Sequence, residues 1–363
     1  MRFGLLQEGL CDPGTDGHTR YREMVEEAVL AEASGFDFYA NSEQHFIVSE
    51  DIVSVSAPEV FLTYVAARTT RLRLRTASTV LLEFNNPVRV AERVATLDVL
   101  SNGRAELGTA RSNNVGTLEA FGIDPTTTRA QWTESLQVVI ACLTSDPFEH
   151  SGERWTIPPR TLSPPCLQQP HPPVYVSASG PETHAIAGRL GIGAMTGASI
   201  IGWQHVEDCA RAYKEAVADP EPLGPAVNDA LCFAALGAHC APTAEQAFDQ
   251  ARRPAIAFLR RMLGPGAMYD SLRTASPDYG YLQGVSEETR ERMDDLEYIV
   301  SVAPYMSIGT PEFLIDRFRR LEALGYDELL LRIDGMGHEV NCRSIESFGR
   351  EVIPACRAGA AAG

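Results

Sequence analysis

Short clusters of polar side chains follow apolar, strand-like segments at several places in this chain of 363 residues. The cluster Glu43-Gln44-His45 directly follows one such segment. A carboxylate beside an imidazole can perform general acid–base chemistry, because histidine titrates near neutral pH. A hydrogen-bonded pair with a purely structural role would explain the same residues. We therefore treat Glu43, Gln44 and His45 as candidate catalytic residues.

A second cluster could bind an anion. Arg111 opens a loop without apolar side chains, RSNN, at the end of the strand-like segment 105–110. A guanidinium group can bind a phosphate through paired hydrogen bonds. A surface arginine or a structural ion pair would explain Arg111 equally well if the loop stood alone.

A hydroxyl-rich turn could contribute further hydrogen-bond donors to the same anion site. The segment 177–183, SASGPET, leads into a helix that is expected to begin at Pro181. The N-terminus of a helix has unpaired N–H groups and the positive end of the helix dipole, so it accepts phosphate. Ser179 and Thr183 could add hydroxyl donors next to Gly180. An ordinary helix cap is the alternative.

Two further positions could face the same ligand. Ser78-Thr79 is small and polar, which would let a flat ring lie against the backbone. His338 follows the glycine-rich GMG and could reach the same cavity or remain a loop residue. We expect the other histidines at 150, 171 and 184 at the surface.

The elements that must position these residues alternate between short apolar strands and amphipathic helices. Eight such units without a dividing linker predict a single (β/α)8 TIM barrel, in which ligands bind at the carboxyl ends of the strands. An open doubly wound sheet is the alternative, but no G-x-G-x-x-G follows the first strand. The expected strands are 1–7, 36–42, 72–80, 105–110, 174–177, 194–195, 231–236 and 328–333.

Three segments interrupt this rhythm within one domain spanning 1–363. Residues 148–173 are expected to form a hairpin followed by a proline-rich connector. Residues 264–304 are rich in Gly, Ser, Asp and Tyr and are expected to form a long insertion or lid. Residues 358–363 are expected to be a disordered tail.

Composition excludes several classes of partner. The net charge of −17 argues against a nucleic acid or an acidic membrane surface. No apolar run approaches the ~18 residues of a membrane-spanning helix. The eight cysteines form no C-x-x-C pair and no metal-ligand cluster. With no signal peptide expected before the strand-like MRFGLLQ, these features predict a cytoplasmic protein without a metal.

Four stretches of the chain resemble the bacterial luciferase-like flavin-dependent monooxygenases. They are SEQHF at 42–46, NPVRVAERVATLDVLSNGRAELGTARSN at 86–113, VYVSASGPETHAIAGRLG at 174–191 and GTPEFLIDRFRRLEALGYDELLLRI at 309–333. The segment 86–113 is specific to that family, and the other three are looser. The resemblance covers nearly the whole chain and implies the (β/α)8 fold already expected.

The resemblance also implies a cofactor and its contacts. Reduced FMN would lie across the strand ends, with its phosphate on Arg111, on the backbone near Asn113 and on the turn of Ser179, Gly180 and Thr183. The flavin ring would lie near Ser78-Thr79, where the family often has a cis peptide bond that does not involve proline. The segment 264–304 would be a mobile lid, and the helices at 58–69 and 87–101 would form a dimer interface.

Two positions depart from the family pattern. Luciferases carry two consecutive histidines after the glutamate, but here the first is Gln44 and only His45 remains. The proton relay would then fall to His45 or His338, with Gln44 as a hydrogen-bonding group. Ala110 replaces a reactive cysteine, so light emission from a long-chain aldehyde is not implied.

The sequence thus predicts a two-component monooxygenase. Reduced FMN from a separate flavin reductase and O₂ would oxygenate a small organic substrate, in a homodimer. An F420-dependent oxidoreductase that transfers hydride without O₂ is one alternative. A non-catalytic flavin-binding partner subunit is another, although the phosphate loop and a full-length lid argue against it.

Overall fold

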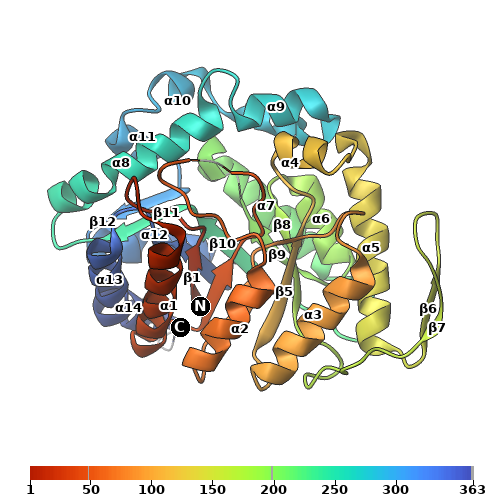
Figure 1. Ribbon diagram of the computed structural model, residues 1–363. Coiled ribbons are helices and arrows are strands. Elements are labelled where there is room, and N and C mark those ends of the chain that lie inside the picture. Colours follow the sequence, from red (N-terminus) through yellow and green to blue (C-terminus); the bar gives the residue numbers. More distant parts are fainter. Residues whose placement is uncertain (48, 198, 361–363) are drawn as a thin grey trace.

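Parallel strands close into a barrel surrounded by helices in the computed structural model, which describes residues 1–47, 49–197 and 199–360 (Figure 1). The barrel closes because β1 pairs with both β2 and β13 while β3 pairs with β5. This confirms the predicted (β/α)8 barrel over an open sheet. Its strands are β1 (Arg2–Gln7), β2 (Phe38–Asn41), β3 (Arg73–Thr76) continued by β4 (Thr79–Val80), β5 (Ala105–Ala110), β8 (Val174–Ala178), β9 (Gly193–Thr196), β10 (Leu231–Ala235) and β13 (Glu328–Arg332).

The helices around the barrel begin where the sequence places caps and prolines. In α3, Asn86 accepts a hydrogen bond from the Val88 N–H and Pro87 occupies the first turn. Val90, Val94 and Leu97 on one side of this helix are buried, whereas Leu100, three residues further on, is exposed. The helices are α1 (Gly17–Ala33), α2 (Pro58–Arg68), α3 (Pro87–Leu100), α4 (Val115–Ala120), η1 (Pro125–Thr127), α5 (Thr128–Thr144), α6 (Pro181–Arg189), η2 (Ser199–Ile201), α7 (Trp203–Val217), α8 (Ala244–Leu263), α12 (Pro311–Ala323), α13 (His338–Ser347), η4 (Phe348–Val352) and α14 (Ile353–Ala360).

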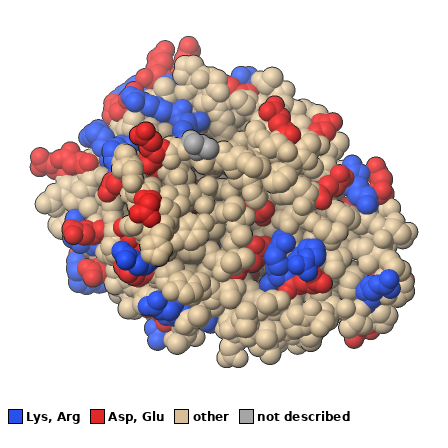
Figure 2. All heavy atoms as spheres, viewed as in Figure 1, with Lys and Arg blue, Asp and Glu red and all other residues tan. Residues whose placement is uncertain are grey.

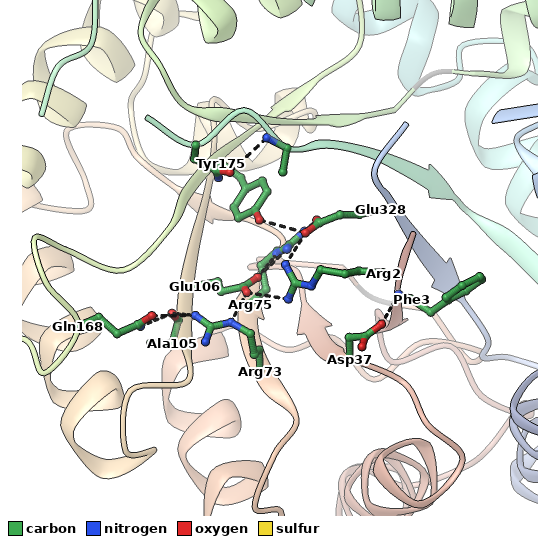
Figure 3. A network of polar contacts seen from close by, with 12 residues as sticks. Arg2, Phe3, Asp37, Arg73, Arg75, Ala105, Glu106, Gln168, Tyr175 and Glu328 are labelled. Atoms are coloured by element: carbon green, nitrogen blue, oxygen red, sulfur yellow. Dashed lines mark hydrogen bonds and ion pairs between the residues drawn. The ribbon is translucent and has the colours of Figure 1, made fainter. Parts of the chain in front are cut away.

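The amino-terminal end of the barrel is filled by a buried ionic network (Figure 3). The Arg75 guanidinium is bound by Glu106 and Glu328 at 2.5 and 2.7 Å, and it lies between the rings of Phe38 and Tyr175 at 4.0 and 3.7 Å. Charged groups inside a protein require such pairing. This network closes the end of the barrel opposite the expected ligand site.

The predicted hairpin is present and projects from the barrel in Figure 1 as the antiparallel pair β6 (Phe148–Ser151) and β7 (Thr156–Arg160). The sequence missed a second parallel pair outside the barrel, β11 (Gly237–Cys240) with β12 (Met306–Gly309). The expected tail at 358–363 needs correction, because α14 runs to Ala360. Residues 361–363 lie outside the described part of the chain.

The insertion at 264–304 is more regular than the sequence indicated. It contains α9 (Met268–Ala275), η3 (Pro277–Gly284), α10 (Glu287–Glu291) and α11 (Leu296–Val302). In Figure 1 these elements, together with α8, cover one end of the barrel, and several of their side chains line the cavity described below. Apolar side chains of the insertion, among them Leu272, Leu282 and Ile299, form a buried cluster together with residues of α8 and β12.

Acidic and basic side chains are interspersed on the face shown in Figure 2. A group of exposed apolar side chains occupies α2 and α3, where Val60 is 68% exposed, Tyr64 56% and Leu100 61%. No helix in the described residues combines the length and the apolar character needed to cross a membrane. All eight cysteines are free thiols.

Candidate active site

A cavity of about 510 Å³ opens at the carboxyl ends of the barrel strands. Residues that follow β1, β2, β3, β5, β8 and β9 line it, and residues of the insertion cover it. Most of the predicted site residues therefore meet in one place. Those that line the cavity are Glu43, Gln44, His45, Ser78, Arg111, Asn113, Ser179 and Thr183.

A candidate anion site lies at the edge of the cavity, where Arg111 lines the wall. Arg111 Nη1 lies 2.5 Å from the Asp278 carboxylate of the insertion, and Arg129 Nε lies 3.0 Å from the same oxygen. Gly180 is the N-cap of α6, and Ser179 and Thr183 lie in the cavity wall beside it. Gly180 itself does not line the cavity, but a Cβ there would come within 2.9 Å of the Tyr281 ring.

Arg129 is a residue that sequence reasoning missed. It lies in the first turn of α5 and meets Arg111 at the Asp278 carboxylate, which both arginines contact. Its Nη2 also contacts Glu182 at 3.1 Å. Two guanidinium groups therefore converge on a single oxygen atom, which is the arrangement that a bound phosphate would use.

Glu43 and His45 form a hydrogen-bonded pair at a second side of the cavity. His45 Nε2 lies 2.8 Å from Glu43 Oε1. The other carboxylate oxygen of Glu43 accepts the Val80 N–H at 2.8 Å, so the carboxylate is fixed from behind. An ionised carboxylate can only accept hydrogen bonds. The His45 ring therefore donates its Nε2–H to Glu43, and Nδ1 is left as an acceptor.

Gln44 is held by a charged pair that the sequence did not reveal. Its Nε2 donates to Glu8 Oε1 at 3.1 Å, while Arg332 Nη1 lies 2.9 Å from the other oxygen of Glu8. An ionised carboxylate can only accept hydrogen bonds, so it fixes the amide with its NH₂ group toward Glu8. The Gln44 side chain thus offers an acceptor rather than a proton, unlike a histidine.

Of the two neighbours Ser78 and Thr79, only Ser78 lines the cavity. The Ala77–Ser78 peptide is cis, as the resemblance implied, and it interrupts the third barrel strand between β3 and β4. Ser78 Oγ lies 2.6 Å from Ser177 Oγ in the cavity wall. Thr79 is fully buried and donates to Glu59 at 3.2 Å, so its side chain does not reach the cavity.

The structure also corrects two expectations about histidines. His338 does not line the cavity but begins α13, with Nδ1 2.9 Å from the buried Glu27 of α1. The hydrogen bond to Glu27 raises the pKa of His338, so it serves a structural pair outside the site. His184 is fully buried rather than exposed, since it bonds the Gly180 carbonyl and Thr196 on the inner face of α6.

The remainder of the cavity is apolar and aromatic. Its walls come mainly from α8 and the insertion, with Phe258, Met262, Tyr269, Leu272 and Tyr305 among them. Burial raises the pKa of Tyr269 to about 12 and that of Tyr305 further, so both phenols remain neutral donors. The described residues contain no group of His, Cys, Asp or Glu side chains that could hold a metal ion.

These features fit a phosphorylated, planar cofactor. The two arginines and the N-terminus of α6 suit a phosphate, and the carboxylate of Asp278 already stands in for an anion there. The wall at the Ala77–Ser78 peptide is formed by small residues that admit a flat ring. Arg111, Arg129, Ser179 and Thr183 are the side chains that could hold the phosphate.

The fold and the site describe a barrel with a ligand cavity at the strand ends, and the comparisons with known proteins identify its family. Residues 1–328 match the model of the luciferase-like monooxygenases. The chain belongs to the luciferase-like monooxygenase family, as the sequence resemblance indicated. It is therefore an enzyme of a family whose relatives include monooxygenases, one of them named as flavin-dependent.

Two curated relatives match almost the full length. The oxygenase component of the flavin-dependent trigonelline monooxygenase of Acinetobacter baylyi is 26% identical over 98% of this chain and 95% of its own. The 4-hydroxyprotoasukamycin monooxygenase of Streptomyces nodosus subsp. asukaensis is 29% identical over 98% of this chain and 92% of its own.

Two solved structures show the same fold at lower identity. The oxygenating constituent of 3,6-diketocamphane monooxygenase from Pseudomonas putida, in complex with FMN, has a TM-score of 0.76 at 18% identity, covering 98% of both chains. The F420-dependent tetrahydromethanopterin reductase of Methanopyrus kandleri has a TM-score of 0.68 at 18% identity, covering 97% of this chain and 98% of its own.

Proposed function

We propose that this protein is the oxygenase component of a two-component monooxygenase, which uses reduced FMN and O₂ to oxygenate a small organic substrate. The observation that carries the proposal is the convergence of Arg111 and Arg129 on one anion position beside the N-terminus of α6. FMN is the phosphorylated cofactor of one structure with this fold. Reduced FMN bound here would supply the electrons for activating O₂.

In this proposal, one set of residues binds the cofactor and another transfers protons. Arg111, Arg129, Ser179 and Thr183 bind the phosphate, with the backbone at Asn113 and Gly180 contributing donors. Ser78 and the adjoining peptide support the ring. The apolar wall from α8 and the insertion excludes water around the reacting atoms.

His45 is the proton-transferring residue in this proposal. Glu43 orients its ring, while Nδ1 remains available to take a proton from a bound molecule. Gln44 accepts a hydrogen bond but cannot carry a proton, so it orients the cofactor or the substrate. His338 and Thr79 have no role in this proposal, because His338 contacts Glu27 and Thr79 contacts Glu59.

We further propose two partners. A separate flavin reductase supplies reduced FMN, an arrangement supported by the relative named as an oxygenase component. A homodimer forms through the exposed apolar face of α2 and α3, which carries Val60, Tyr64, Val99 and Leu100. Burying such a face removes apolar area from water. A cytoplasmic location remains our prediction, supported by the free cysteines.

Flavin titration and oxygen consumption test the proposal. Oxidised FMN, photoreduced FMN and F420 are each titrated into the protein without oxygen, and binding is followed by cofactor fluorescence or absorbance. We expect FMN binding, followed by O₂ consumption when the reduced complex is aerated. Binding of neither FMN redox state would refute the flavin site.

The same titration tests the alternative of an F420-dependent oxidoreductase. That alternative is supported by the fold shared with the F420-dependent reductase. Preferential binding of F420, with turnover that needs no O₂, would establish it over our proposal. Turnover by the purified chain alone would exclude a non-catalytic partner subunit.

A further inference from the structure

The insertion places a carboxylate where the proposed flavin phosphate would bind. One oxygen of Asp278, in η3, lies 2.5 Å from Arg111 Nη1 and 3.0 Å from Arg129 Nε. A phosphate that accepted from the same donors, Arg111 Nη1 and Arg129 Nε, would need this position. Phosphate and Asp278 therefore cannot both make these contacts.

Other contacts dock η3 onto both phosphate-binding loops. The Tyr279 hydroxyl donates to the Ser112 carbonyl at 3.0 Å, next to Arg111. The Tyr281 ring covers Gly180 so closely that a Cβ at that position would lie 2.9 Å from it. Asp278 is thus held at the anion position by its neighbours in the chain, and is not a freely mobile surface acid.

The charges favour replacement of the carboxylate by a phosphate. Burial opposes ionisation of Asp278, but hydrogen bonds from Arg129 and Arg111 outweigh it and lower the pKa of the carboxyl. Asp278 is therefore an anion at neutral pH. A phosphate monoester carries up to two negative charges and three acceptor oxygens, so it neutralises the two arginines more completely.

We propose that Asp278 is a built-in competitor for the flavin phosphate, which weakens cofactor binding so that the flavin is exchanged rather than retained. This inference rests on the proposed FMN-dependent function. Binding of FMN must move η3 away from Arg111 and Arg129, so phosphate binding and opening of the insertion are linked. A weakly held flavin suits an enzyme that receives its reduced cofactor from a reductase.

The test compares FMN with riboflavin, which has the same ring but no phosphate. Fluorescence titrations are made on the full-length wild type, Asp278→Asn and a control, Asp294→Asn. Asp294 lies in the same insertion but pairs with the exposed Arg260. We expect Asp278→Asn to bind FMN about tenfold more tightly, because a charge-assisted competitor is lost, and to bind riboflavin as the wild type does.

A second measurement reports on the movement itself. Hydrogen exchange of residues 277–284 in the wild type should rise on addition of FMN and remain unchanged with riboflavin. Inorganic phosphate should also compete with FMN less effectively in the wild type than in Asp278→Asn. These readouts do not depend on turnover.

These measurements distinguish failure of the competition by Asp278 from failure of the proposed flavin site. FMN affinity that is unchanged or weaker in Asp278→Asn, with riboflavin binding intact, overturns the competition while leaving the flavin site in place. An equal gain for FMN and riboflavin also overturns it, because the carboxylate would then act on the ring or on the entrance. If no variant binds either flavin, the proposed function itself fails and the competition fails with it.

Discussion

Replacing Glu106 by glutamine should destabilise the fold more than any comparable surface change. Glu106 is buried at the amino-terminal end of the barrel and contacts Arg2, Arg73 and Arg75 (Figure 3). Burial opposes its ionisation, but these arginines outweigh the burial and lower its pKa from 4.5 to about 2. Each pKa unit corresponds to about 1.4 kcal/mol, so the ionised carboxylate contributes about 3 kcal/mol to stability.

The substitution Glu106→Gln keeps the size of the side chain and removes its charge. Arg75 would then retain only Glu328 among its carboxylate partners, and removing one member of a buried pair costs about 3–5 kcal/mol. We expect a loss of about 3 kcal/mol in the free energy of unfolding at pH 7, measured by urea denaturation. Glu297→Gln is the control, because Glu297 pairs with Arg252 at the surface and should cost under about 1 kcal/mol.

The stability difference between the wild type and Glu106→Gln should depend on pH. A carboxyl group with a lowered folded-state pKa stabilises the protein fully above its unfolded pKa of about 4.5 and loses that contribution as the pH falls toward 2. The difference between wild type and Glu106→Gln should therefore shrink in acid. If Glu106→Gln loses no more stability than Glu297→Gln at pH 7, the network does not stabilise the barrel and the reasoning is wrong.

Three further predictions follow from the site and the surface. Arg129→Ala should weaken FMN binding about tenfold or more and spare riboflavin in fluorescence titrations; equal losses for both flavins would contradict a phosphate role. Tyr64→Glu should give a monomer in analytical ultracentrifugation, and a persistent dimer would exclude the α2–α3 face. Burial lowers the pKa of His184 and of His239 to about 4, so stability should decline as the pH falls from about 6.5 to 4; urea midpoints should show a shallower decline in His184→Gln, and an identical slope would refute this.

The barrel and part of its site could be predicted from local patterns. Strand and helix periodicities depend on side chains a few residues apart, so the eight strand–helix units were visible in the sequence. A barrel then places every loop that follows a strand at one end. This is why Arg111, Ser179 and the Glu43–His45 pair, which are far apart in the chain, met in one cavity as expected.

Local patterns were insufficient where the direction of a side chain decides its role. Ser78 and Thr79 are neighbours, but the Thr79 hydroxyl donates to the buried Glu59 and only Ser78 reaches the cavity. His338 follows the last barrel strand, as a site residue would, but the path of the chain turns it toward Glu27 on α1. His184 faces inward because α6 packs that side against β9.

The sequence by itself determined the family, the barrel and the loops that carry Arg111, Ser179 and His45, because each rests on a contiguous motif. Only the tertiary structure brought Arg129 and Asp278 to Arg111, and Glu8 to Gln44. These contacts join residues that are up to 167 positions apart. Their energy depends on distance and burial in space, which no local pattern records.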